Sequence, residues 1–237
     1  MICVVAAPSA LAQTDAQFAK ANQEYAQGDF KESISSYESL IRGGPWNANL
    51  FYDLGNAYFR TGDFGRAILN YERALALEPH HPEATANLQI ARDEAHALEL
   101  QPSWPERYLR FATINQYSFT AAVAFWVGVS CLVLLIFARR RSAMAAVLLL
   151  AMFSILAVAI FSIWQLDRGV KGRALAIVTA DNVQARIATA DTANSVLALP
   201  PGSQVKILST RGDWIYAALP SNLRGWIPAK SAEQVRL

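Results

Sequence analysis

The side chains that could carry out chemistry in this chain are few and scattered. Its histidines are His80 and His81, which adjoin each other in a turn, and His96 further along. None of them has cysteines or paired carboxylates around it at the spacing that metal ligands need. Cys131 lies in an apolar run, where a thiol is not activated as a nucleophile. The sequence also lacks a Gly-rich phosphate loop and a Gly-x-Ser-x-Gly motif. We therefore predict a binding protein rather than an enzyme, with no catalytic residue, cofactor or metal.

A repeated pattern in residues 14–100 indicates the elements that would build a binding surface. The segment from Tyr25 to Phe30 recurs from Tyr58 to Phe64. A spacing of 34 residues relates Gly28 to Gly62, Asp29 to Asp63, Phe30 to Phe64 and Tyr37 to Tyr71. We infer a spacing of 33 for Tyr25 and Tyr58, with a first turn one residue shorter. This period is that of a helix–turn–helix unit, in which Gly-Asp ends one helix and caps the next and the aromatic side chains form the core.

The second copy resembles the tetratricopeptide repeat family. The matching positions are Leu54, Gly55, Tyr58, Gly62, Phe64, Ala67, Tyr71, Ala74 and Pro79. The first copy is less regular, with Asn22, Ser33 and Leu40 where small or apolar residues are usual. A third segment, 82–100, is expected to be a long charged helix that covers the open end of the stack. The resemblance implies an all-α solenoid over residues 13–100.

Repeats of this family usually bind peptides along the concave face made by their first helices. In this chain that face would present Asn49, Tyr52, Asn56 and Phe59 from the second copy and Gln23 from the first. Asn56 occupies the place where many members carry an asparagine that hydrogen-bonds the backbone of a ligand. Tyr52 stands where a carboxylate-clamping lysine would be expected, so capture of a terminal carboxylate is not predicted. Two interpretations of Asn56 stay open, ligand contact and a solvent-facing side chain.

Two uncharged apolar runs follow, roughly 117–137 and 143–166, and each approaches the ~20 residues that a helix needs to cross a bilayer. The short loop between them, which contains Arg139, Arg140 and Arg141, requires a helical hairpin. The residues before and after the hairpin must then lie on one side of the membrane. The alternative is a buried hairpin in a soluble protein.

The start of the chain bears on the orientation of this hairpin. Ala10-Leu11-Ala12 before Gln13 matches the end of a secretory signal, and we expect the missing charged region of that signal to lie upstream of Met1. Both soluble parts are then predicted outside the cytoplasm, with the arginine triplet inside. Basic residues near the other helix ends oppose this orientation. They are Arg107, Arg110, Arg168, Lys171 and Arg173. Cys3 is not expected to be lipidated after Ile2, and no disulfide framework is predicted.

Residues 174–237 alternate in a pattern typical of short strands, with turn residues between them. Their order resembles the bacterial SH3 domain, on the motifs Asn182-Val183-Gln184, Leu199 to Leu208, Gly212-Asp213-Trp214 and Gly225-Trp226-Ile227. The resemblance implies a small all-β barrel of about 60 residues. Trp214 and Tyr216 share one face of their strand and form a possible ligand face, whereas Trp226 is expected in the core.

The order of modules resembles the BatE-type proteins of bacterial aerotolerance operons. That order is 1–12 signal remnant, 13–100 repeats, 101–116 linker, 117–138 first membrane helix, 139–142 loop, 143–166 second membrane helix, 167–173 linker and 174–237 β domain. The resemblance implies a two-pass inner-membrane scaffold that works with von Willebrand A-domain proteins and a MoxR-type ATPase in envelope stress or complex assembly. Binding of cell-wall peptides by the β domain is the alternative. The net charge of +2 and the lack of a basic face exclude nucleic acid.

Overall fold

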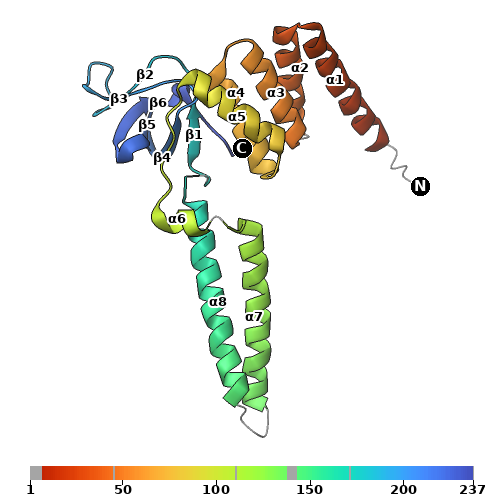
Figure 1. Ribbon diagram of the computed structural model, residues 1–237, viewed down its shortest axis with the longest axis vertical. Coiled ribbons are helices and arrows are strands. Elements are labelled where there is room, and N and C mark those ends of the chain that lie inside the picture. The colour runs from red at the N-terminus through yellow and green to blue at the C-terminus, as the bar shows by residue number, and fades with distance from the viewer. Residues whose placement is uncertain (1–6, 45, 110, 138–142, 171, 237) are drawn as a thin grey trace. The chain divides into compact units, whose positions relative to one another are not determined.

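The computed structural model describes residues 7–44, 46–109, 111–137, 143–170 and 172–236. They form two compact units, one made of Met1–Leu100 with Leu175–Leu237 and the other of Gln101–Ala174. The first unit contains a helical repeat and an antiparallel β-sheet, and the second contains two long apolar helices (Figure 1). The predicted multidomain fold class is therefore confirmed.

The helical repeat consists of α1 (Ala7–Gln27), α2 (Phe30–Gly43), α3 (Ala48–Arg60), α4 (Phe64–Leu77) and α5 (Pro82–Ala95). Asn47, Asp63 and His81 each begin a helix by accepting a hydrogen bond from the backbone N–H three residues on, at 2.7, 3.0 and 3.3 Å. The chain leaves α1 and α3 through Gly28 and Gly62, which have φ of 89° and 81°. Glycine adopts this left-handed conformation without steric cost, so the predicted turns form where the Gly-Asp pairs stand.

A single spacing of 34 residues relates the two copies of the repeat throughout. The ring of Tyr25 lies edge-on to Phe30, with 5.3 Å between centroids, and Phe59 lies edge-on to Phe64 at 5.5 Å. The backbone hydrogen bonds that close the two turns are equivalent as well. Tyr25 therefore corresponds to Phe59, and the predicted equivalence of Tyr25 and Tyr58 through a shorter first turn is wrong because the two turns have the same length.

This register also reassigns the tightest packing position of the first copy. Ala21, and not Asn22, corresponds to Gly55, and both Ala21 and Gly55 are buried. A Cβ atom at Gly55 would lie 2.7 Å from a ring carbon of Tyr71, so the second copy requires glycine there. Asn22 corresponds to Asn56 instead.

Helix α1 runs from Ala7 without a break past Ala12, the predicted cleavage point. Residues 1–6, and with them Cys3, lie outside the described residues. The secretory signal therefore stays a prediction.

The last helix of the repeat is shorter than predicted. Helix α5 ends at Ala95, and His96 adopts a left-handed conformation with φ of 50°. The chain then extends over residues 97–100 and pairs with the sheet. The predicted helix over 82–100 is wrong at its C-terminal end because Leu98 and Leu100 donate their backbone hydrogen bonds to the side chains of Ser203 and Gln204 instead of to the preceding turn.

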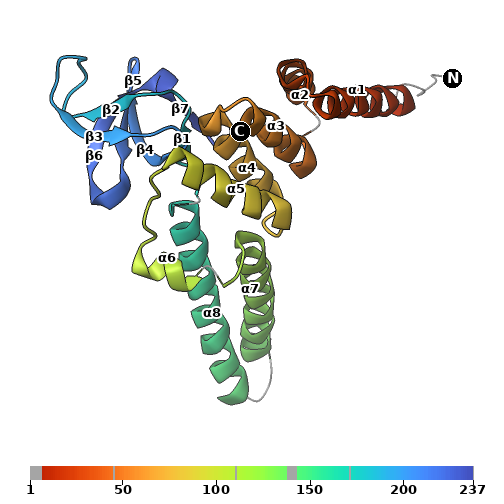
Figure 2. The ribbon, with the colours of Figure 1, turned by 45° about the horizontal axis from the view of Figure 1, so that its top comes forward.

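The sheet follows the order β3-β2-β6-β5-β4-β1-β7, and all of its ladders are antiparallel. Its strands are β1 (Leu175–Val178), β2 (Val183–Arg186), β3 (Ser195–Leu199), β4 (Gln204–Arg211), β5 (Trp214–Ala218), β6 (Arg224–Pro228) and β7 (Ala232–Gln234). One core cluster draws buried residues from each of these strands, so the sheet curls around a single core (Figure 2).

The helical repeat and the sheet are joined by hydrogen bonds between buried groups. Gln204 N donates to Leu98 O at 2.8 Å, and Leu98 N donates to Ser203 Oγ at 3.1 Å. The side chain of Gln204 accepts from Leu100 N at 3.2 Å and donates to Glu72 Oε1 at 3.0 Å. Glu72, Ser203 and Gln204 are almost fully buried. Residues on the two sides of the apolar hairpin in the sequence thus form one structural unit.

The second unit contains a short helix, α6 (Trp104–Leu109), and two long helices, α7 (Ile114–Phe137) and α8 (Ala143–Asp167). Helices α7 and α8 pack side by side (Figure 1). Both are long and apolar enough to cross a membrane, and only 17 % and 6 % of their most apolar stretches are buried. A buried core hairpin would hide these faces, so the structure favours a membrane-spanning pair over that alternative. The arginine triplet at 139–141 lies outside the described residues.

Candidate protein-binding surface

One stripe of α3 presents the predicted binding residues. Asn49 is exposed, and Tyr52, Asn56 and Phe59 are partly exposed. The opposite side of the helix is buried against its neighbours through Leu50, Phe51, Leu54, Ala57 and Tyr58. Residues three and four apart share a helix face, so this arrangement follows from the helical period. The structure therefore brings four of the five predicted residues together.

Asn56 lies at the centre of a hydrogen-bond network in this stripe. Its Oδ1 accepts hydrogen bonds from the Tyr71 hydroxyl at 2.8 Å and from Asn87 Nδ2 at 2.9 Å. Asn87 Nδ2 also lies 3.3 Å from the hydroxyl of Tyr52. These contacts fix the amide so that Nδ2 is the group left to donate, and the described residues provide no acceptor for it. Asn56 is thus an oriented donor, and its bonds with Tyr71 and Asn87 were not predicted from the sequence.

The first copy of the repeat contains an equivalent pair. The Tyr37 hydroxyl donates to Asn22 Oδ1 at 2.6 Å, as Tyr71 does to Asn56. Burial raises the pKa of both tyrosine hydroxyls, which therefore remain protonated donors. Gln23, the residue predicted from the first copy, is exposed one position further along α1. Asn22 was missed because of the incorrect spacing of 33, and the 34-residue register would have found it.

The sequence prediction also missed Asp53, which lies on the same stripe of α3. Asn49, Asp53 and Asn56 follow one another at helical spacing, and Asp53 is half-buried. Burial raises the pKa of Asp53 to about 6, and the charge of His81 opposes that shift. Asp53 was overlooked because an aspartate at a helix surface carries no distinguishing signal in a single sequence.

Aromatic contacts support the two ends of the stripe. Tyr52 lies against His81, with 5.0 Å between ring centroids, and His81 in turn caps the start of α5. At the other end, the guanidinium of Arg60 lies 4.5 Å above the ring of Phe30. The stripe therefore has a tilted pair of rings on one side and a cation–π pair at the end of the helix.

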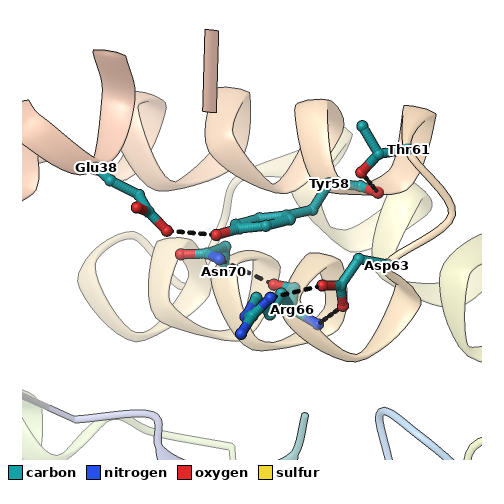
Figure 3. Close-up of polar contacts among 6 residues, drawn as sticks. All are labelled: Glu38, Tyr58, Thr61, Asp63, Arg66 and Asn70. Carbon is teal, nitrogen blue, oxygen red and sulfur yellow. Dashed lines mark hydrogen bonds and ion pairs between the residues drawn. The ribbon is translucent and has the colours of Figure 1, made fainter. Parts of the chain in front are cut away.

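A separate network behind the stripe holds α3 against its neighbours (Figure 3). The Tyr58 hydroxyl donates to Glu38 Oε1 of α2 at 2.5 Å. In α4, Asp63 accepts hydrogen bonds at 3.0 Å from both the backbone and the side chain of Arg66, and Asn70 Nδ2 donates to Arg66 O at 2.9 Å. The Tyr58–Glu38 bond joins α3 to α2, and the Arg66 guanidinium lies 5.7 Å from the centroid of the Tyr58 ring. The bonds of Asp63 and Asn70, by contrast, lie within α4 and its N-cap.

The sheet contains the other predicted surface. Trp214 and Tyr216 are partly exposed, while Ile215 and Ala217, which alternate with them, are buried. Trp226 of β6 lies opposite Tyr216, and the two rings are in tilted contact with 5.0 Å between centroids. The prediction that Trp226 belongs to the core is wrong, because Gly225 and Ile227 on either side of it point inward. The outer face therefore combines aromatic side chains from two strands.

The other candidates for chemistry are on elements that contribute no residue to either surface. His96 is exposed at the end of α5, and Cys131 is buried along α7. Within the described ranges no group of three or more His, Cys, Asp or Glu side chains is arranged to hold a metal ion.

Comparison with known families identifies the helical part. Residues 18–82 match the family described as tetratricopeptide repeat, from α1 to the start of α5. A comparison with curated proteins found no match. The predicted repeat is thus confirmed for this region, and such repeats serve protein–protein interaction.

Proposed function

We propose that this protein is a non-enzymatic, membrane-anchored adaptor that binds partner proteins through the α3 stripe of its helical repeat. The observation that carries the proposal is the partly exposed Asn56 amide, whose Oδ1 is held by Tyr71 and Asn87 and whose Nδ2 has no acceptor among the described residues. An oriented amide beside half-exposed aromatic side chains suits the recognition of an extended peptide backbone. The apolar pair α7 and α8 would hold this surface at a membrane.

We further propose a two-pass bacterial inner-membrane location, with both soluble parts outside the cytoplasm. The hydrogen bonds of Gln204 with Leu98 and Glu72 support one part of this proposal, because groups in contact must lie on one side of the bilayer. The resemblance to BatE-type proteins supports Bat-type membrane proteins with von Willebrand A domains as partners, in aerotolerance or envelope stress.

The test is quantitative co-purification with the full-length protein from its native membranes. The informative variant combines Tyr52→Ala with Phe59→Ala and retains Asn56, since Asn56→Ala would also deprive the buried Tyr71 hydroxyl of its acceptor. The double variant should lose its partners. A matched control combines Trp46→Ala with Leu77→Ala, two exposed apolar residues outside the stripe. Equal recovery with both variants would contradict the proposal.

The second candidate function is binding of cell-wall peptides by the sheet. It is favoured by the outer face on which Trp214, Tyr216 and Trp226 gather, and by the resemblance to bacterial SH3 domains. Sedimentation with purified peptidoglycan should use the full-length protein in detergent, because the sheet shares buried hydrogen bonds with the helices. Co-sedimentation that Trp214→Ala abolishes would support this function, and failure of the unmodified protein to sediment would exclude it.

A further inference from the structure

Asp53 is the charged group at the middle of the α3 stripe. It lies one helical turn from both Asn49 and Asn56, on the face that stays open, and its side chain is half-buried. Among the residues that the structure describes, it makes no hydrogen bond or ion pair. The basic residue of α3 is Arg60. Its guanidinium does not pair with Asp53 but lies over the ring of Phe30, 4.5 Å from the ring centroid.

Electrostatic effects connect Asp53 with a residue of α2 and with the residue that caps α5. Its charge raises the pKa of the Tyr37 hydroxyl, and that hydroxyl donates to Asn22. On the other side, His81 at the start of α5 acts on the pKa of Asp53 itself. The carboxylate therefore lies within electrostatic reach of α2 and of α5, while Asn56 is on its own helix.

An unpaired carboxylate in this position carries a free-energy cost. Burial raises the pKa of Asp53 to about 6, so at neutral pH the group is ionised and only partly solvated. An uncharged asparagine of the same size would avoid that cost. A cation supplied by a ligand would offset it, because a charge-assisted hydrogen bond is stronger where water is partly excluded. A site that sacrifices stability in this way is typical of a functional surface.

We propose that the stripe selects an extended peptide segment that carries a lysine or arginine, whose cationic side chain pairs with Asp53. The inference rests on the proposed function of the stripe and adds the chemistry of its partner. The Nδ2 groups of Asn22 and Asn56 would donate hydrogen bonds to backbone carbonyl oxygens of the same segment, one from each copy of the repeat.

The test measures binding of full-length protein in detergent to arrayed octapeptides with blocked termini. The array fixes Lys, Arg, Gln or Glu at one position and randomises the others, and a second set has free amino termini. The best binders are then titrated by fluorescence anisotropy against Asp53→Asn and against Glu32→Gln, an exposed carboxylate on α2 that serves as the matched control.

Peptides with Lys or Arg should bind best. Asp53→Asn should weaken the affinity for these peptides by about ten-fold or more, while Glu32→Gln should leave that affinity unchanged. Asp53→Asn is not expected to unfold the protein, because it removes a desolvated charge without changing the size of the side chain. Binding without preference for Lys or Arg, or equal binding to Asp53→Asn, would overturn this inference and leave the proposed function intact. Binding of free amino termini alone would also overturn it. Absence of peptide binding altogether would contradict both.

Discussion

The two copies of the repeat share one register, yet their second helices lie in different environments. Glu38 of α2 and Glu72 of α4 are equivalent residues, but 42 % of the Glu38 side chain is exposed and only 3 % of Glu72. Glu38 accepts a hydrogen bond from Tyr58, whereas Glu72 pairs with Arg92 at 2.5 Å and with Gln204 at 3.0 Å. The difference arises because α5 and the sheet cover α4. The second copy is thus the structural centre of its unit, and the first copy is the more open part.

The contact between α4 and the sheet should be the most sensitive point in this comparison. A Cβ at Gly202 would lie 2.2 Å from Ile68 Cδ1 and 3.3 Å from Ala97 Cβ, at a φ of 83°. Since Ile68 is fully buried, we expect Gly202→Ala to destabilise the unit by about 2–5 kcal/mol, from left-handed strain plus overpacking. Gly212→Ala is the matched control, because its φ is also positive but nothing lies within 4 Å. Thermal unfolding followed by tryptophan fluorescence measures both, and equal losses would show that α4 does not depend on the sheet.

The next largest effect on stability is expected for the two equivalent glutamates, Glu72 and Glu38. Glu72→Gln removes a buried charge from beside Arg92 and should cost about 1.5–3 kcal/mol. Glu38→Gln should cost less than about 1 kcal/mol, because that side chain is partly open to water and the glutamine Oε1 can still accept from Tyr58. Unfolding of the two variants under the same conditions gives the difference directly. A similar loss of stability in the two variants would mean that the contact with the sheet does not stabilise α4.

The half-buried carboxyl group of Asp53 predicts how the free energy of unfolding depends on pH. Its folded pKa of about 6 lies above the reference value of 3.8, so the folded state binds the proton more tightly than the unfolded chain. Stability should therefore fall as the pH rises from about 4 through 6 and level off above that. Discounted for the part of the side chain that is open to water, Asp53→Asn should stabilise by about 1–2 kcal/mol at pH 8. That gain should vanish near pH 4, and a gain independent of pH would contradict the assignment.

The tyrosine–asparagine pairs should show the smallest effects. Tyr71→Phe leaves Asn56 with Asn87 as its remaining donor and should cost about 1 kcal/mol. Tyr37→Phe should cost about half as much, because Asn22 is exposed and water replaces the lost bond. Backbone hydrogen exchange in α2, which contains Tyr37, and in α4, which contains Tyr71, measures the loss of stability in each variant. A larger loss of stability for Tyr37→Phe than for Tyr71→Phe would contradict the conclusion that the first copy is the more open one.

Much of the fold follows from local patterns, and the rest depends on contacts that no local pattern encodes. The repeat, the apolar helices and most of the strands follow from periodicity and turn residues. The outward face of Trp226 was also readable, because the apolar Ile227 follows it in alternation. By contrast, the bond between Gln204 and Glu72 joins residues 132 positions apart. A single sequence contains no signal for such a pairing. The same limit applies to Asp53, whose significance depends on its burial and on neighbours from other helices.

Position-resolved photo-crosslinking in living cells tests the central claim most directly. A photoreactive amino acid would replace Asn49, which is exposed on the α3 stripe, or Ser39, which is exposed on α2 outside it. If the stripe binds partner proteins, the full-length protein should form a discrete higher-mass adduct from position 49 and none from position 39. Adducts from position 39 alone, or equal adducts from both positions, would contradict that claim.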